Sequence, residues 1–455
     1  MKVTQARRIA FDVLRRVEAE SAYAADLLHA RLRGIKHEDA ALATELTLGV
    51  LRWRRLLDLL LERHVTQPLD DLDLEVLLAL RIGLYQLRHL SRIPARAAVN
   101  ESVELVKWAK KSSAARLVNA VLRRAVEEAG KPAESSVPAD LPAAERLAIL
   151  YSHPTWMVER WLSFFGKART VALLEANNRP HHTTCVVLEE GQAEQVADAL
   201  RKAGLRVEPG KLLRSALILR GGNPSRTDAF RRGQVLFQSE ASHMVALLVD
   251  AQPGQRVLDL CAAPGGKAAV LARAAGSQAL VVAADTHLHR LRATRENLER
   301  AGATHACLVA LDATASLPFS TEFDRILVDA PCSGTGTLAA NPEIRWRLRP
   351  EDLADFHRRQ TQLLVHALDS LAPGGRLVYS TCSLELEENE QVVAEVAGQR
   401  RDIRCVPGAA TLAPHLKQGL GPEGFFESDH CFRTFPPEHD TDGFFAAVFE
   451  RSLKA

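Results

Sequence analysis

The sequence predicts a multidomain protein in which an all-α N-terminal domain and a small α/β module precede a C-terminal α/β domain. Three observations lead to this fold class. Helical periodicity runs through the first 128 residues, a segment rich in proline, glycine and serine follows, and strand-like apolar runs alternate with helical stretches from about residue 231. At roughly 100–200 residues per domain, 455 residues leave room for two to four domains.

Residues 1–129 form the predicted helical domain. Between residues 71 and 91, leucines recur at steps of three and four and line one helical face: Leu77, Leu80, Leu84 and Leu87. The first helix has a similar stripe of Ile9, Val13 and Val17, with Arg8 and Arg15 on its other side. Residues 1–131 hold 23 lysines and arginines against 17 acidic residues, although the whole chain carries a net charge of +2. This basic excess is compatible with a polyanionic partner.

Residues 130–140 are predicted to be a linker, because proline, glycine and serine dominate there and offer little to a core. The small α/β module is expected over residues 141–230. Its expected elements are two short helices, a strand, a helix and a second strand, at about 142–152, 154–165, 183–188, 191–203 and 216–219.

The C-terminal domain, residues 231–455, contains short apolar runs separated by helical stretches. These runs are 256–260, 280–285, 326–329 and 375–380. The pattern predicts buried parallel strands in an open α/β sheet. In such sheets ligands bind beyond the carboxyl ends of the strands, so we expect the functional residues there.

The cysteines and the hydropathy pattern exclude several classes of protein. The seven cysteines are never closer than 23 residues apart, which excludes a dense disulfide framework and a local Cys-x-x-Cys metal site. No run of 18 apolar residues exists, and the first eight residues lack the apolar core of a signal peptide. We therefore expect a cytoplasmic protein with no metal and no membrane contact.

A candidate cofactor loop follows the first predicted strand. Its residues are Cys261, Ala262, Ala263, Pro264, Gly265, Gly266 and Lys267. Small residues let a ligand approach the backbone, and the helix that follows offers free N–H groups. A nucleotide P-loop would need glycine at 261 and serine or threonine at 268, and the dinucleotide pattern G-x-G-x-x-G is absent as well. An ordinary glycine-rich turn stays an alternative.

Two aspartates after the next strands favour a nucleoside ligand. Asp285 ends the second strand, at the distance from the glycine turn where a carboxylate accepts hydrogen bonds from ribose hydroxyls. Asp312 comes where a third strand is expected to end. S-adenosylmethionine, a nucleoside cofactor without a pyrophosphate, fits these features. The alternative is that either aspartate only caps a helix.

Two cysteines follow the fourth and fifth predicted strands. Asp329-Ala330-Pro331-Cys332 ends the fourth, and Ser380-Thr381-Cys382 ends the fifth. Both have polar or small neighbours, so we interpret them as reactive thiols at the ligand-binding edge. The other free cysteines, Cys185, Cys307, Cys405 and Cys431, are expected in the core, where free cysteine usually lies.

These motifs together resemble the NOL/NOP/Sun family of RNA 5-methylcytosine methyltransferases. The resemblance rests on residues 261–267, 329–336 and 380–383, and extends to 233–242, 388–390 and 442–445. Residues 4–128 are similar to the antitermination factor NusB. The resemblance implies a NusB-like helical domain, a ferredoxin- or RRM-like middle module and a Rossmann-like class I methyltransferase domain.

The resemblance also implies a reaction. It implies S-adenosylmethionine-dependent methylation of C5 of a cytosine, and the NusB-like fusion implies 16S ribosomal RNA of the small subunit as substrate. It assigns Cys382 as the nucleophile that adds to C6 and Cys332 as the helper of product release. It places residues 261–267, Asp285, Asp312 and Asp329 around the cofactor, with Asp329 also at the cytosine amino edge. We expect a monomer whose helical domain adds RNA affinity.

The chain departs from the family pattern in four places: Ser239, Cys185-Val186-Val187, Ala268 and the pair Ala339-Ala340. They replace polar or cationic groups expected to face RNA, so they bear on the target rather than on the reaction. A different ribosomal or transfer RNA target therefore stays open. So do an amino-group methyltransferase, which would have Asn/Asp-Pro-Pro-aromatic where Asp329-Ala330-Pro331-Cys332 stands, and a non-catalytic RNA-binding or antitermination protein.

Overall fold

The computed structural model describes residues 3–20, 22–128, 130–180 and 182–453. Its contacts divide the chain into two units, each made of two segments. Unit 1 comprises Met1–Pro180 with Leu338–Leu348, and unit 2 comprises His181–Thr337 with Arg349–Ala455. The chain thus passes from unit 2 into unit 1 shortly after Cys332 and then returns.

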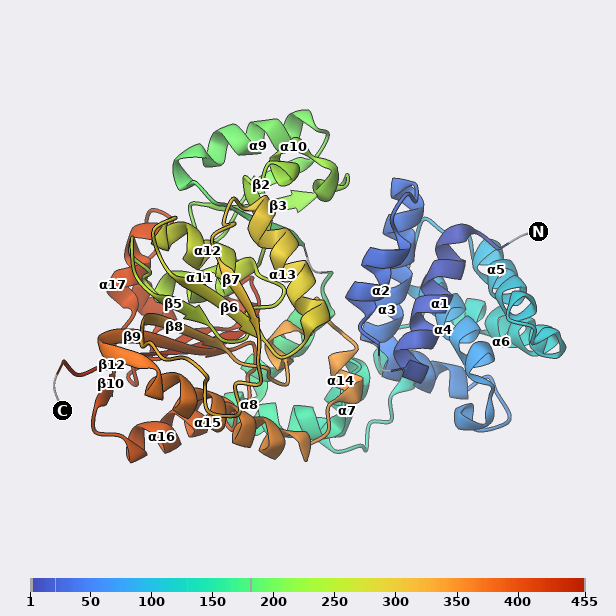
Figure 1. The fold of residues 1–455 in the computed structure, drawn as a ribbon. Coiled ribbons are helices and arrows are strands. Elements are labelled where there is room, and N and C mark those ends of the chain that lie inside the picture. The colour runs from blue at the N-terminus through green and yellow to red at the C-terminus, as the bar shows by residue number, and fades with distance from the viewer. Residues whose placement is uncertain (1–2, 21, 129, 181, 454–455) are drawn as a thin grey trace. The chain divides into compact units, whose positions relative to one another are not determined.

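Unit 1 begins with the helices that the periodicity predicts (Figure 1). They are α1 (Gln5–Glu20), α2 (Ala24–Arg31), α3 (His37–Glu62), α4 (Leu74–His89), α5 (Ala95–Trp108) and α6 (Ala115–Glu128). The apolar stripe of α1 is buried, and Arg8 and Arg15 of the same helix are exposed, as expected. Between α2 and α3 the chain turns at Gly34, whose φ of 77° is a conformation that glycine adopts without strain.

Two further helices, α7 (Ala143–Leu150) and α8 (Thr155–Asn178), also belong to unit 1. The sequence pattern predicts that the second of them ends near residue 165. The first helical segment does end there, because Gly166 has non-helical backbone angles, φ 71° and ψ 172°, and two helical segments meet at this kink within α8. The second segment, which continues to Asn178, was not predicted.

The segment 338–348 is held in unit 1 mainly by Arg345, whose side chain is fully buried. Its guanidinium donates hydrogen bonds to the backbone oxygens of Ser152 and Asn177, each at 3.1 Å. Trp346 donates from Nε1 to a carbonyl of α3 at 2.6 Å. Burial lowers the pKa of Arg345 to about 9, so this cation depends on the carbonyls around it. Deletion of residues 1–131 would remove α3, and with it part of the surface to which the segment 338–348 is bonded.

Unit 2 contains a small four-stranded antiparallel sheet in the order β2-β3-β1-β4. The strands are β1 (Thr183–Val187), β2 (Arg206–Pro209), β3 (Ala216–Arg220) and β4 (Val235–Phe237), and α9 (Ala193–Lys202) packs against them. Strands β1 and β3 and helix α9 were predicted. Strands β2 and β4 were not, because β2 is mostly exposed and the apolar run of β4 is only three residues long.

The larger sheet of unit 2 has the order β10-β12-β9-β8-β5-β6-β7, with β11 paired to β12. Its strands are β5 (Val257–Asp259), β6 (Val281–Asp285), β7 (Cys307–Ala310), β8 (Phe323–Asp329), β9 (Leu371–Thr381), β10 (Ile403–Cys405), β11 (Phe432–Thr434) and β12 (Phe444–Arg451). Strands β5 to β9 are parallel, which confirms the predicted open α/β sheet. The antiparallel β12 extends the sheet beyond β9.

Both faces of the large sheet are covered by helices (Figure 1). Helices α11 (Glu240–Leu248), α12 (Gly266–Ala275) and α13 (Leu288–Arg300) lie on one face, and α15 (Asp352–Asp369) and α16 (Glu390–Gln399) lie on the other. Alternate residues of these strands belong to cores on opposite faces of the sheet. Val257 and Leu327 belong to one core, and Leu258 and Ile326 belong to the other. Burial on both faces explains why these strands appear as continuous apolar runs in the sequence.

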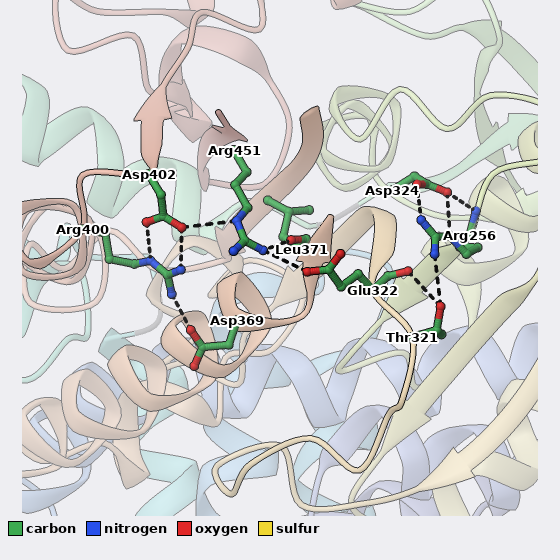
Figure 2. A network of polar contacts seen from close by, with 9 residues as sticks. All are labelled: Arg256, Thr321, Glu322, Asp324, Asp369, Leu371, Arg400, Asp402 and Arg451. Atoms are coloured by element: carbon green, nitrogen blue, oxygen red, sulfur yellow. Dashed lines mark hydrogen bonds and ion pairs between the residues drawn. The ribbon is translucent and has the colours of Figure 1, made fainter. Parts of the chain in front are cut away.

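A polar network fastens the edge at which the parallel strands begin (Figure 2). Arg256, just before β5, donates to both carboxylate oxygens of Asp324 in β8, at 2.8 Å from Nη2 and 3.1 Å from Nε. These hydrogen bonds lower the pKa of Asp324. At the end of β12, Arg451 contacts Asp402 and Glu322, and Arg400 pairs with the same Asp402. The network therefore lies at the edge opposite to the one where the strands end and where ligands are expected.

Within the described ranges, no helix combines the length and the apolar character needed to cross a bilayer.

Candidate active site

The two candidate thiols come together at the carboxyl ends of neighbouring strands. β8 and β9 pair in parallel, and the backbone N–H of Ala330 continues the ladder by donating to the carbonyl of Ser380 at 2.8 Å. Beyond that point, Cys332 Sγ lies 3.3 Å from Cys382 Sγ. The N–H of Gly336 donates to the carbonyl of Cys382 at 2.9 Å, so the two loops are also joined by backbone.

The two thiols share a hydrogen bond in which either sulfur could be the donor. This hydrogen bond, followed by burial, raises the pKa of the Cys332 thiol well above its ordinary value. The geometry places the two thiols side by side, and the assignment of Cys382 as the nucleophile comes from the family resemblance.

Asp329 lies between the thiol loop and the glycine turn. One oxygen accepts a hydrogen bond from Lys267 Nζ at 2.6 Å, and the other accepts from Ser380 Oγ at 2.8 Å. Lys267 also stands 5.2 Å from the centroid of the Phe444 ring. Lys267 is thus paired with a carboxylate.

A buried carboxylate that the sequence interpretation did not select lies at the end of β5. Asp259 is 1% exposed, and among the described residues neither of its carboxylate oxygens has a hydrogen-bond partner. Burial and the neighbouring charge of Asp329 raise its pKa to about 7. The rule that selected Asp285, an aspartate at the end of a strand, could have found Asp259 as well.

The glycine turn, residues 261–267, connects β5 to α12. Gly265 has φ of 100°, and a Cβ there would stand 3.0 Å from the Cα of Thr294 in α13. The N–H of Ala262 donates to the carbonyl of Ala284 at 2.8 Å, and Asn297 Nδ2 donates to the carbonyl of Pro264 at 2.6 Å. The turn is thus held tightly against the second strand and α13, close to the carboxylates that follow these strands.

The two predicted ribose-binding aspartates differ in their surroundings. Asp285 is buried, accepts from the N–H of His287 at 3.1 Å, and has Arg290 Nη1 3.2 Å from Oδ2. Asp312 is exposed, and its Oδ1 accepts from the N–H and the hydroxyl of Thr314, which lowers its pKa. Asp312 therefore makes hydrogen bonds within a local turn and caps no helix, while Asp285 faces the glycine turn by accepting from the N–H of Ala263 at 3.4 Å.

A second buried carboxylate missed by the sequence interpretation joins the two thiol loops. Glu388 is fully buried, and its Oε1 accepts from the N–H of Ser333 at 2.8 Å and from Gln360 Nε2 at 3.0 Å. Its Oε2 accepts from the hydroxyls of Ser333 and Ser383. Each serine directly follows one of the thiols. Residues 388–390 belong to the resemblance, but nothing in the local pattern connects them to the cysteines.

The remaining cysteines only partly match the expectation of a core position. Cys185 and Cys431 are buried, and burial raises the pKa of Cys185 to about 12. The expectation is wrong for Cys307, which is exposed in β7 near the edge of the sheet. The buried position of Cys185 also means that this departure from the family pattern changes a core, not an RNA-facing surface. No group of His, Cys, Asp and Glu able to hold a metal ion occurs among the described residues.

Family models match most of the chain. A model described as 16S rRNA methyltransferase RsmB/F matches residues 246–450, the NusB family matches residues 4–127, and an RsmF/B-like ferredoxin-like domain matches residues 153–225. These matches and the two sheets confirm the predicted fold class, with a helical N-terminal domain, a ferredoxin-like middle domain and a C-terminal methyltransferase domain.

Full-length relatives and solved structures are also similar. The chain is 32% identical over 450 residues to the probable ribosomal RNA small subunit methyltransferase B of Bacillus subtilis, with 98% of each chain covered. It is 35% identical over 408 residues to ribosomal RNA small subunit methyltransferase B of Pseudomonas putida, covering 87% of this chain and 90% of the relative. The crystal structure of PH0851 matches with a TM-score of 0.81 at 25% identity, covering 99% and 100%. A methyltransferase homolog from Pyrococcus horikoshii matches with a TM-score of 0.57 at 28% identity, covering 68% and 99%.

Proposed function

The chain belongs to the RsmB/F family of 16S ribosomal RNA methyltransferases, and from that membership we propose that it methylates C5 of a cytosine in 16S ribosomal RNA through a covalent intermediate. The cytosine we propose is the one equivalent to position 967. The observation that carries the proposal is the pair of thiols 3.3 Å apart at the ligand-binding edge of the sheet.

The chemistry of cytosine explains why a thiol pair is needed. C5 is a poor nucleophile toward a sulfonium methyl group. Addition of the Cys382 thiolate to C6 turns the ring into an enamine, so that C5 can attack. We assign Asp329 to the cytosine edge, where a carboxylate accepts from the N4 amino group and pairs with a protonated N3.

Cys332 is assigned to the release of the product. After methyl transfer the C5 proton must leave, and the C6–S bond to Cys382 must break. The hydrogen bond to Cys382 is the largest cause of the raised pKa of Cys332. Once Cys382 is bonded to C6, its sulfur no longer carries thiolate charge, so Cys332 ionises more easily at the step where a base is needed.

The cluster around the glycine turn fits S-adenosylmethionine, which supplies an electrophilic methyl group when bound. The unpartnered carboxylate of Asp259 suits a cationic group, because a buried charge without a partner is costly and a cation relieves that cost. Asp285 suits the ribose hydroxyls, and residues 261–267 bring the backbone close to the ligand. Asp312 is the proposed third contact. Because the mechanism needs two free thiols, we place the protein in a reducing compartment such as the cytoplasm.

Cofactor binding is expected to depend on pH through Asp259. Its pKa near 7 means that the carboxylate is partly protonated at neutral pH. If a cation binds the ionised form, affinity rises with pH, by up to about tenfold per unit below 7, and levels off above it. Asp259→Asn should weaken binding and flatten this dependence. Titration calorimetry between pH 5.5 and 8.5, a range on the order of three units around that pKa, measures both effects. An unchanged profile in Asp259→Asn would remove this residue from the cofactor site.

The helical domain is proposed to add RNA affinity through exposed cations such as Arg8 and Arg15 on α1. In the double variant Arg8→Ala/Arg15→Ala, the slope of log K against log salt should fall by about 0.7 to 0.9 for each lost phosphate contact. Arg201→Ala is the matched control, because Glu194 and Asp198 already neutralise this exposed arginine. Substitutions are preferable to deleting residues 1–131, because the deletion would also remove α3, to which the segment that contains Arg345 is bonded. Equal slopes for the double variant and the wild type would exclude this role.

One experiment tests the proposed reaction directly. The full-length protein is incubated with radiolabelled S-adenosylmethionine and unmodified 16S ribosomal RNA, and the labelled nucleoside is identified after digestion. Labelled 5-methylcytidine supports the proposal, whereas label on an amino group would indicate the other class of methyltransferase. Absence of label in RNA, with cofactor binding intact, would favour an RNA-binding protein. Mapping the labelled position distinguishes 16S ribosomal RNA from another target.

A further inference from the structure

Besides the backbone hydrogen bond from Gly336 to Cys382, a buried carboxylate joins the loops that carry the two thiols. Glu388 precedes α16, while Ser333 and Ser383 each follow one of the thiols on separate loops. Its two oxygens accept hydrogen bonds from both serine hydroxyls and from the N–H of Ser333. The serine oxygens lie 2.9 Å apart.

The surroundings of Glu388 hold it in place. Gln360 of α15 donates from Nε2 to Glu388 Oε1 at 3.0 Å, the oxygen that also accepts from the N–H of Ser333. The same nitrogen donates to the carbonyl of Pro331 at 2.9 Å. The hydroxyl of Tyr379 donates to the backbone oxygen of Glu388 at 2.6 Å. A fully buried carboxylate that accepts this many hydrogen bonds is expensive to form and resists movement. The carboxylate therefore defines where both loops can lie.

We propose that Glu388 is a positioning residue that sets the distance between Cys332 and Cys382 by bridging Ser333 and Ser383. The significance of this spacing for methyl transfer rests on the function proposed above. The role of Glu388 in setting the spacing does not depend on that function, because the spacing can be measured without RNA or cofactor.

Two substitutions at Glu388 separate its hydrogen bonds from its charge. In Glu388→Gln, the amide oxygen can still accept from Ser333 N–H and Gln360, and the amide nitrogen can donate to both serine hydroxyls, which accept as well as donate. In Glu388→Ala, all of these bonds are lost. The bridge is thus expected to persist in the glutamine variant and to be absent from the alanine variant.

The distance between the thiols is measured by trapping with phenylarsine oxide. The reagent bonds to two neighbouring thiols and releases one molecule of water, and peptide mapping identifies the pair. Loss of positioning lowers the effective concentration of one thiol near the other. We expect Glu388→Ala to trap Cys332 with Cys382 at least about tenfold more slowly than the wild type, and Glu388→Gln to trap it within about twofold.

The matched control is Glu240→Ala. Glu240 is also a buried carboxylate, but it accepts from the backbone N–H groups of Lys211, Leu212 and Leu213 in the loop before β3. This variant should trap the thiol pair at the wild-type rate. If Glu388→Ala does not fold, the double variant Ser333→Ala/Ser383→Ala replaces it, with slowed trapping again expected because the hydroxyl bridge is gone.

Turnover provides a second measurement. Glu388→Ala should lower kcat by at least about tenfold with the KM for S-adenosylmethionine nearly unchanged, and Glu388→Gln should restore most of kcat. Wild-type trapping in Glu388→Ala, or in the double serine variant, would overturn the proposal, even if methylation of cytosine were established. If Glu388→Ala is trapped slowly but the wild-type protein methylates no cytosine, the positioning role of Glu388 is supported and only the proposed function is contradicted.

Discussion

Cys382→Ala is expected to lose methylation by at least about three orders of magnitude, because without addition to C6 the cytosine C5 does not attack the methyl group. Binding of S-adenosylmethionine should persist, since the proposed cofactor residues belong to other loops and do not bond to the Cys382 side chain. The measurement is incorporation of labelled methyl groups into 16S ribosomal RNA, with cofactor affinity determined in parallel by calorimetry.

Cys307→Ala is the matched control for this loss. Cys307 is a free thiol and is more exposed than Cys382, but it lies in β7, three strands away from β8 in the sheet order. Its replacement should leave turnover close to that of the wild type. Substantial methylation by Cys382→Ala would contradict its assignment as nucleophile and would favour a reaction that needs no thiol.

Cys332→Ala is expected to stop the reaction after the methyl transfer. With the nucleophile intact and the helper of release absent, the protein should remain bonded to the RNA through Cys382. The covalent complex migrates more slowly than free protein on a denaturing gel. Its yield should approach one RNA per protein, and turnover beyond the first cycle should be lost, because breakdown of the adduct becomes rate-limiting.

The double variant Cys332→Ala/Cys382→Ala tests the origin of this complex. If Cys382 forms the bond, the slow band disappears in the double variant, whereas an adduct through another residue would persist. Full turnover by Cys332→Ala, with no adduct, would mean that Cys332 has only a structural role. The two single variants also separate the rival functions, since an amino-group methyltransferase requires neither thiol.

Much of the catalytic domain could be predicted from short-range patterns. The strands β5, β6, β8 and β9 were predicted because each is an apolar run, buried on both faces. Parallel strands end at the same edge, so the sequence also predicts that Cys332 and Cys382 lie near each other. In contrast, β2, β4, β10 and β11 have only three or four residues each, and local patterns of that length do not distinguish strand from loop. The longer strand β12 was not predicted, although residues 444–449 are an apolar run and are buried.

Residues whose role depends on distant partners were not predicted. Asp259 differs from Asp285 chiefly in having no partner for its oxygens, which depends on the packing around it. Glu388 lies 55 residues from Ser333, and only the folded chain brings them to 2.8 Å. Cys307 was expected in the core because free cysteine is usually buried, but its place near the sheet edge leaves it exposed.

Local patterns in the amino-acid sequence are enough to predict the order of the domains, the parallel sheet, the glycine turn and a thiol at the end of each of two strands. These properties follow from hydropathy period and from motifs, which act over a few residues. The folded chain is needed to learn that the thiols stand 3.3 Å apart, that Glu388 joins their loops, and that Arg345 is buried in unit 1. Burial of a charge is decided by all the carbonyls and side chains that surround it, and those come from segments far apart in the chain.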